Sequence, residues 1–175
     1  MDKPNLPSVK MTSGGVIVYT VKGGVVRILL LEQNNKRYAQ KGRKSKKRVI
    51  DIGPSGRLEQ GETTLEAATR ELKQETNLEL NIEDDYTDSY SYVFEGEALE
   101  GKDKGRRARI IKTRKYHIAY ASDEQLKKLR LSDEHISYRF ATIDEALASK
   151  DIMRPQKGLL KRLKERFALS SANVN

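Results

Sequence analysis

Residues Gly56 to Leu78 read GRLEQGETTLEAATRELKQETNL, a glycine-punctuated turn followed by a helical pattern with an acidic side. Thr63 is followed three residues later by Glu66, a capping-box pattern that predicts the start of a helix at this point. Asn77 fits the position just past the helix end, because asparagine tolerates the left-handed conformation that glycine usually supplies there. The stretch therefore predicts one turn and one helix with defined ends.

One side of this predicted helix is apolar. Three residues recur at i, i+3 and i+7 spacing, namely Leu65, Ala68 and Leu72. Because residues at that spacing share a face, we expect this side of the helix to pack on a sheet.

The adjacent side of the helix is acidic. Glu71 and Glu75 are four residues apart with Gln74 between them, and like charges at that spacing weaken an isolated helix by about a few tenths of a kcal/mol. A hard divalent cation such as Mg²⁺ or Mn²⁺, which takes oxygen ligands, turns this repulsion into a binding site. The alternative is a solvated acidic face. It is disfavoured because the pair stands beside Arg70 and soon after a glycine-rich loop.

The stretch resembles the Nudix box, Gly-x5-Glu-x7-Arg-Glu-U-x-Glu-Glu-x-Gly-U, where U is aliphatic. The matching positions, seven of nine specified, are Gly56, Glu62, Arg70, Glu71, Leu72, Glu75 and Leu78. Gln74 stands in place of the first glutamate of the Glu-Glu pair, and Asn77 stands in place of the glycine. The resemblance covers about residues 12 to 168, although only the box itself is highly specific.

The resemblance implies an activity, a cofactor and site residues. Nudix proteins typically hydrolyse a nucleoside diphosphate linked to another group, by attack of water on a phosphorus, with Mg²⁺ or Mn²⁺. It implies Glu71 and Glu75 as metal ligands and catalytic residues, Gln74 as a third ligand, and the backbone carbonyl of Gly56 as a further one. The amide of Gln74 brings less charge than a carboxylate, so we expect weaker binding of a second or third ion.

The remaining box residues have supporting roles by the same resemblance. Arg70 orients the carboxylates through charged hydrogen bonds, and Glu62 bridges the loop to Arg70 as a structural residue. A degenerate box, kept only as an element of the fold or as a binding module, is the alternative that Gln74 leaves open.

A second motif lies late in the chain. Residues 131–140 read LSDEHISYRF, which resembles the Ser-x-Glu-His-x-x-Tyr-x-aromatic stretch of the asymmetric dinucleoside tetraphosphate hydrolases. Glu134 is therefore our candidate for a further metal ligand or general base, with Asp133 as the fallback. The alternative for Glu134 is an exposed loop carboxylate. His135 and His117 are interpreted as packing residues, since nothing pairs them at ligand spacing.

The formal net charge is +9, and it is concentrated in two windows. Lys36 to Arg48 holds eight basic residues in thirteen, and Lys102 to Lys115 holds eight in fourteen. Such windows suit polyphosphate or nucleic-acid backbones, although a solvated loop is the alternative for each. The candidate substrate-binding residues are Lys44, Lys112, Arg114, Lys115 and Tyr116, the last as a ring that stacks on a base.

The sequence leaves three hypotheses for the function open. Dinucleoside tetraphosphate hydrolases usually carry Pro-Lys-Gly-His before the first box glutamate, whereas this chain has Pro54-Ser55-Gly56-Arg57. A dinucleoside polyphosphate is the first hypothesis, because of Glu134 and the basic windows. The triphosphate end of RNA is the second, and a nucleotide-sensing or RNA-binding module without catalysis is the third.

Length and composition set the remaining expectations. A chain of 175 residues with 37% apolar content suits a single domain, 1–175, with a core at about 12–168 and frayed ends. There is no cysteine, which excludes disulfides and thiol chemistry. Since no apolar run has the length of a signal peptide or membrane span, we expect a soluble, cytoplasmic protein without a membrane partner. The partners expected are a nucleotide or dinucleotide and, in the second hypothesis, RNA; the oligomeric state stays open.

The order of elements indicates an α/β fold. Strands are expected at Gly14–Thr20, Val25–Glu32, Val49–Ile52, Leu78–Ile82, Tyr86–Phe94, Ile110–Tyr120 and Tyr138–Ala141, and the first two are expected to form a hairpin around the turn signal at 22–24. After the box helix, further helices are expected at Ser122–Leu129 and Thr142–Ala148, each opened by a capping box, and at Gln156–Leu169, whose inner face is expected to hold Leu159, Leu160, Leu163 and Phe167. The alternating aromatic residues Tyr86, Tyr90, Tyr92 and Phe94 are expected to pack rather than bind. This pattern predicts an α/β/α sandwich with a mixed, curled sheet, which is also the Nudix fold that the resemblance implies.

Overall fold

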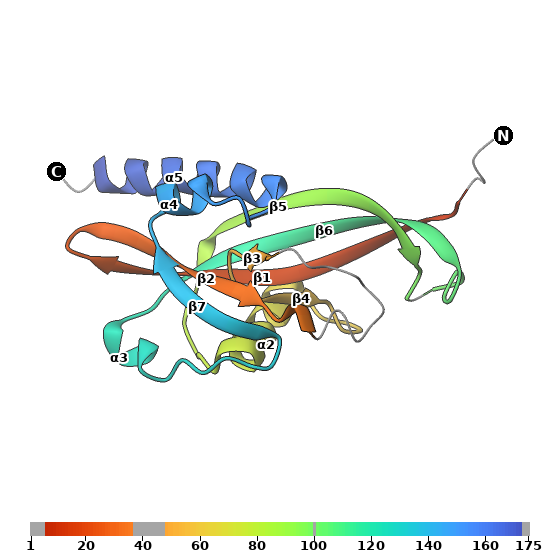
Figure 1. Cartoon of the computed structure of the whole chain (residues 1–175), viewed down its shortest axis with the longest axis horizontal. Helices are drawn as coiled ribbons and strands as arrows, with labels where there is room; N and C mark the ends of the chain where they lie inside the picture. Colours follow the sequence, from red (N-terminus) through yellow and green to blue (C-terminus); the bar gives the residue numbers. More distant parts are fainter. Residues whose placement is uncertain (1–5, 37–47, 100, 173–175) are drawn as a thin grey trace.

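The computed structural model describes residues 6–36, 48–99 and 101–172, which form a seven-stranded mixed sheet with helices on both faces (Figure 1). The strands are β1 Ser8–Lys22, β2 Val25–Gln33, β3 Ile50–Asp51, β4 Ser55–Arg57, β5 Ile82–Glu97, β6 Arg107–Tyr120 and β7 His135–Ala141. The helices are α2 Thr64–Thr76, α3 Asp123–Leu126, α4 Ile143–Ala148 and α5 Arg154–Ala172.

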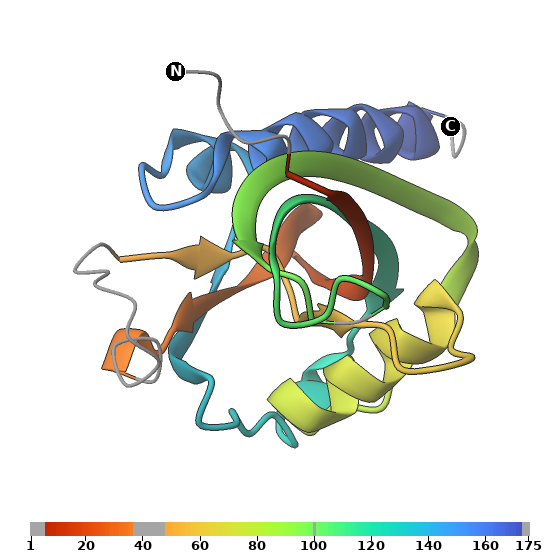
Figure 2. The ribbon, with the colours of Figure 1, turned by 90° about the vertical axis from the view of Figure 1, so that its right-hand side faces the viewer.

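The main path of the sheet runs in the order β3-β2-β1-β6-β5, while β4 pairs with β1 and β7 with β2. The central pair, β1 and β6, is parallel, and the other pairs are antiparallel. Figure 2 shows α5 and α2 on opposite sides of the curled sheet. The predicted α/β sandwich with a mixed sheet is therefore confirmed.

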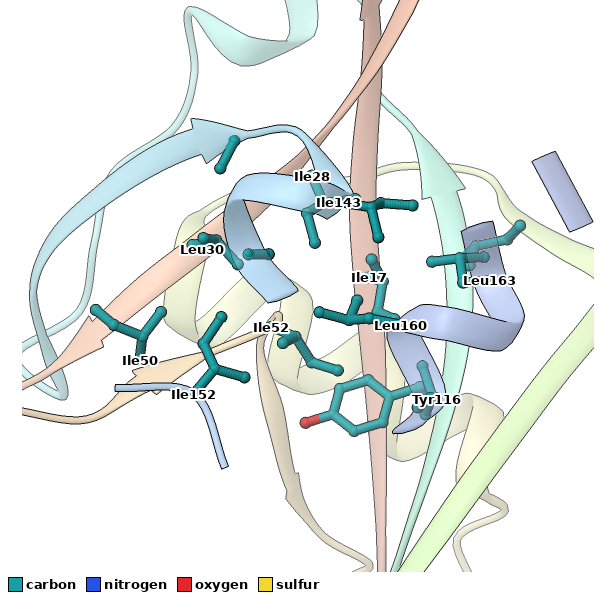
Figure 3. Close-up of a cluster of buried hydrophobic side chains, with 14 of the residues drawn as sticks. Ile17, Ile28, Leu30, Ile50, Ile52, Tyr116, Ile143, Ile152, Leu160 and Leu163 are labelled. Atoms are coloured by element: carbon teal, nitrogen blue, oxygen red, sulfur yellow. The ribbon is translucent and has the colours of Figure 1, made fainter. Parts of the chain in front are cut away.

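Alternation along β1 divides the core into two clusters, one on each face of the sheet. Val16 and Val18 point toward α2, where Ala68 and Leu72 meet them. Ile17 points the other way, into the cluster covered by α4 and α5 (Figure 3). That second cluster includes Tyr116, Ile143, Leu160 and Leu163. Because both faces are covered, the middle of β1 is fully buried.

The helix α2 lies directly on the backbone of β1. A Cβ atom at Gly14 would come within 2.1 Å of the carbonyl oxygen of Thr64, so only glycine permits this approach. The helix ends as the sequence predicts: Thr63 and Glu66 form a capping box, and Asn77 has a φ of 59°. Gly14 therefore sets the distance of the acidic helix from the sheet, the capping box sets its start, and Asn77 sets its end.

The capping boxes expected at Ser122 and Thr142 are both present. The hairpin of β1 and β2 also forms, and its strands extend beyond the predicted bounds. The inner face of α5 holds Leu159, Leu160 and Leu163, as its periodicity predicts.

Two expectations are wrong. Residues 78–81 form no strand, because Leu78 is buried by packing beneath α2 and not by pairing with another strand. Leu65 is 39% exposed, and Ala67 takes the inner position because a smaller side chain lets α2 approach the sheet. In the part of the chain that the structure describes, no helix is long and apolar enough to cross a bilayer.

The two leucines of α2 provide a test of which face is buried. We expect Leu72→Ala to lower the free energy of unfolding by about 2–5 kcal/mol, because it leaves a cavity between α2 and the sheet. The matched variant Leu65→Ala should change it by no more than about 0.5 kcal/mol. Urea unfolding followed by circular dichroism measures both. Equal losses in the two variants would contradict the observed orientation of α2.

Candidate active site

The guanidinium group of Arg70 is the centre of the box. Its Nε donates to Glu62 Oε1 at 2.7 Å, and its Nη2 donates to Glu62 Oε2 at 2.9 Å. Its Nη1 donates to Glu71 Oε1 and, at 3.2 Å, to Gln74 Oε1. Nη2 also donates to the backbone carbonyl of Arg57 at 3.0 Å. The Arg70 side chain thus joins the loop before α2 to two oxygen acceptors on the helix.

The bidentate bond changes the acidity of Glu62. The Arg70 hydrogen bonds, together with the bond from the backbone N–H of Glu59, 2.8 Å from Oε2, lower the pKa of this carboxyl to about 2. Glu62 therefore stays ionised, and its charge is satisfied by Arg70 and by the loop.

Gly56 lies against the carboxylate of Glu71. A Cβ atom at Gly56 would stand only 1.8 Å from Glu71 Oε1 and 2.1 Å from its carboxyl carbon. The strand β4, which carries Gly56, is held in this place by antiparallel pairing with Gly14 of β1. Close approach explains why glycine begins the box, and it brings the backbone of Gly56 beside a predicted metal ligand.

Glu75 is buried and hydrogen-bonded to His135. The distance from Glu75 Oε2 to His135 Nε2 is 2.7 Å, and each side chain is only 5% exposed. Burial raises the pKa of the Glu75 carboxyl; the His135 hydrogen bond opposes this, and the charges of Glu71 and Glu134 add to the rise. Burial alone would lower the pKa of His135, but the bond to Glu75 outweighs it and the pKa is raised.

His135 is the residue that sequence reasoning missed. It was interpreted as a packing histidine because no partner stood at ligand spacing, yet the fold places Glu75, sixty positions away, against its ring. The signal available was its place beside Glu134 in the second motif. Its sequence separation from the box hid the contact.

The loop that carries Glu134 is tied to the end of α2. The backbone N–H of Ser132 donates to the Glu75 carbonyl at 3.0 Å, and that of Arg130 donates to the Thr76 carbonyl at 2.9 Å. The Glu134 carbonyl accepts from Asn34 N–H at 2.7 Å. Glu134 is half-buried near Glu75, whereas Asp133 is exposed. The structure therefore brings the box helix and the second motif together.

These groups match the donors that a hard dication prefers. Glu71, Glu75 and Glu134 supply carboxylate oxygens, and Gln74 and Gly56 supply amide and carbonyl oxygens. In residues 6–36, 48–99 and 101–172, no three acidic or histidine side chains stand together as a ready-made metal centre. Instead, Glu71 is bonded to Arg70 and Glu75 to His135. The donor chemistry fits Mg²⁺ or Mn²⁺, with each glutamate held by a protein partner.

The candidate substrate-binding residues do not form one surface. Lys112 and Arg114 share the face of the sheet that α5 covers, whereas Lys115, one residue further along β6, lies on the face of α2. Tyr116 is fully buried in the core, so its ring offers no face to a base, and that expectation is wrong. Lys44 lies outside the described residues.

Arg114 connects this face to the box. Its Nη1 lies 3.4 Å from Ser55 Oγ, directly before Gly56, and 4.0 Å from Asp51 Oδ1. The side chain is only 16% exposed. The largely buried guanidinium group of Arg114 therefore lies close to β4, whose Gly56 contacts Glu71.

The structure combines a mixed sheet between helices with an acidic helix held by an arginine. Comparison with known proteins identifies the class of protein that has these features. The family model of the NUDIX domain matches residues 10–163. The chain therefore belongs to the Nudix family.

Several solved structures have a similar fold. An Ap4A hydrolase of C. elegans in a binary complex is 23% identical, with a TM-score of 0.66 over 90% of this chain and 98% of that one. A MutT protein from Methanosarcina mazei Go1 is 17% identical, with a TM-score of 0.60 over 94% and 98%. The NUDIX domain of Shewanella oneidensis NrtR, complexed with ADP ribose, is 8% identical, with a TM-score of 0.53 over 91% and 89%. At these identities the likeness shows the fold alone. No curated protein matches the sequence significantly.

The pair formed by Arg70 and Glu62 should make stability depend on acidity. Because the pKa of Glu62 is lower in the folded chain than in the unfolded chain, the pair stabilises the fold above about pH 4.5 and loses this effect as the pH falls toward about 2. We therefore expect Glu62→Gln to destabilise the protein near about pH 6 and to converge with wild type in acid.

Glu59→Gln is the matched control for that variant. Glu59 is 69% exposed and lies 3.7 Å from the Arg70 Nε, so its loss should change stability little at any pH. Denaturant unfolding across the pH series measures both variants. A difference between Glu62→Gln and wild type that stays constant from neutral to acid pH would contradict the coupling.

The contact between Glu75 and His135 gives a second prediction. His135→Phe leaves the buried Glu75 carboxylate without its partner and should cost about 1–3 kcal/mol of unfolding free energy. His135→Gln retains a donor and should cost less. The measurement is urea unfolding at neutral pH. If the phenylalanine variant were as stable as wild type, the hydrogen bond would have no role in holding Glu75.

Proposed function

We propose that this protein is a divalent-metal-dependent pyrophosphohydrolase that cleaves a phosphoanhydride between nucleosides, with a dinucleoside polyphosphate as its substrate. The observation that carries the proposal is the pair Glu71 and Glu75, which lie one turn apart on α2 and are each held by a separate partner. Two anchored carboxylates, of which Glu71 lies beside the backbone of Gly56, suit the binding of a cation between protein and phosphate.

The residues that would hold Mg²⁺ or Mn²⁺ are Glu71, Glu75, Gln74, Glu134 and the carbonyl of Gly56. When bound, such an ion neutralises charge on the phosphate oxygens and acidifies a coordinated water. Gln74 supplies one negative charge less than the glutamate of the usual box. Glu134 contributes a carboxylate from a different element, and this offsets part of the difference.

The protein residues have separate roles in the proposed reaction. Arg70 acts as a positioning residue, since its hydrogen bonds point Glu71 and Gln74 to the same side of α2. Glu62 keeps Arg70 in place. Glu134 accepts the proton of the attacking water, and its charge already acts on Glu75 in the folded chain.

A dinucleoside polyphosphate is favoured by the contact between the two motifs. The Glu134-His135 pair resembles that of dinucleoside tetraphosphate hydrolases, and it meets the box through Glu75. The cationic Arg114 beside Ser55 offers a contact for a phosphate chain that extends from the box. The 5'-triphosphate end of RNA is the second candidate, favoured by a row of aromatic and basic side chains on β5 and β6.

Hydrolysis by the purified protein tests the proposal directly. With Mg²⁺ or Mn²⁺, we expect diadenosine tetraphosphate to give ATP and AMP, measured by chromatography. Glu75→Gln should lower turnover by about a hundredfold or more, because it removes charge that neutralises the transition state. Glu79→Gln should not change it, since Glu79 is 77% exposed and pairs with Lys73.

Other results would contradict parts of the proposal. Wild-type turnover in Glu75→Gln would exclude Glu75 from the metal site. Activity confined to triphosphorylated RNA would select the second candidate. Turnover that does not depend on added dication after treatment with a chelator would contradict metal dependence.

A further inference from the structure

The strands β5 and β6 extend beyond the helix that covers them. Figure 1 shows the hairpin continuing past the N-terminal end of α5, and we call the paired strand residues of this extension, 92–97 and 107–112, the arm. The cover of α5 on β5 is fixed by two ion pairs, Arg162 with Asp88 and Arg166 with Asp85, both at 2.7 Å. Both ion pairs use residues of β5 that precede the arm in the sequence. These contacts therefore hold α5 over the part of β5 before the arm.

A row of aromatic rings runs along β5 into the arm. The ring centroids of Tyr90 and Tyr92 are 6.1 Å apart, and those of Tyr92 and Phe94 are 5.8 Å apart, each pair at an interplanar angle of 26°. Tyr90 is only 8% exposed, whereas Tyr92 and Phe94 are half-buried. Tyr90 thus belongs to the core, Tyr92 packs against its edge, and Phe94 continues the row, with both Tyr92 and Phe94 partly exposed.

Cations stand beside this row on the neighbouring strand. In the antiparallel register, Arg114 is opposite Tyr90 and Lys112 is opposite Tyr92, and paired residues share a face. The acidic residues of the arm strand, Glu95 and Glu97, alternate to the other face, where Glu95 binds Arg107 at 2.7 Å. Within the arm, the aromatic face thus carries positive charge without a carboxylate from β5, whereas Asp88, on the same face before the arm, is paired with Arg162 of α5.

Aromatic faces next to cations are the chemistry that recognises single-stranded nucleic acid. Every base has a π-face that stacks on a tyrosine or phenylalanine ring, while lysine and arginine neutralise the phosphates. From Tyr90 to Phe94 the row spans about 13 Å, at about 3.3 Å per residue.

We propose that the arm binds single-stranded RNA on the face formed by Tyr92, Phe94 and Lys112. The row is continuous with the candidate active site, because Arg114 reaches Ser55, and Ser55 precedes the Gly56 that abuts Glu71. Among single-stranded nucleic acids, RNA can carry a phosphoanhydride at its 5' end. The choice of RNA over DNA rests on the second candidate substrate given under the proposed function, whereas the binding face itself does not.

Fluorescence anisotropy of the full chain with a labelled RNA of about ten nucleotides tests the proposal. The RNA carries a 5'-hydroxyl and no phosphoanhydride, so binding is measured apart from hydrolysis. We expect Tyr92→Leu and Phe94→Leu, which keep an apolar side chain, to weaken binding by about fivefold or more each. Val93→Ala is the matched control on the opposite face and should bind as wild type does.

The salt dependence of binding gives an independent measurement. Lys112→Gln should lower the slope of log K against log salt by about 0.7, because one phosphate contact is lost. Arg109→Gln, on the same strand and the opposite face, should leave the slope unchanged. Because Lys112 is half-exposed, its variant keeps the proposal testable even where an aromatic variant does not fold.

Three results would overturn the proposal. They are no binding by wild type at low salt, equal effects of the aromatic-face and opposite-face variants, and tighter binding of DNA than of RNA of the same sequence. Hydrolysis of diadenosine tetraphosphate with no RNA binding would reject the arm proposal and leave the proposed function intact. RNA binding without hydrolysis of any phosphoanhydride would support the arm proposal and reject the proposed function.

Discussion

The geometry of the candidate site depends on one guanidinium group. Arg70 bonds to the loop through Glu62 and the Arg57 carbonyl, and to the helix through Glu71 and Gln74. Without a cation at this place, the acidic groups of the loop and of the helix would repel one another. Because the planar fork of arginine meets several oxygens at once, a single residue sets both the distance between loop and helix and the direction of Glu71.

A second constraint joins the box to the rest of the fold. The ring of His135, at the start of β7, holds the buried Glu75 at the C-terminal end of α2. Backbone bonds from Ser132 and Arg130 to the last turn of α2 fix the same loop. The two glutamates of the acidic face are therefore anchored from opposite directions, one by the loop before α2 and the other by the strand that follows α3.

Local features of the sequence predicted much of the fold. The ends of α2, α3 and α4 follow from capping boxes, which are interactions between residues three positions apart. Periodicity predicted the β1–β2 hairpin and the inner face of α5. It failed at Leu65, where the smaller Ala67 packs inward, and at residues 78–81, where buried leucine marks packing and not strand pairing. Sequence reasoning also failed at Lys115, because a run of basic residues does not indicate which face of a strand each side chain occupies.

The sequence by itself determined the box, its capping residues and the spacing of Glu71 and Glu75, because these depend on the regular geometry of one helix. Only the tertiary structure decided that Glu75 meets His135, that Gly56 abuts Glu71, and that the ring of Tyr116 is inside the core. Each of these contacts joins segments distant in the chain. Their geometry follows from strand order and from the close approach of α2 to Gly14, which no local pattern encodes.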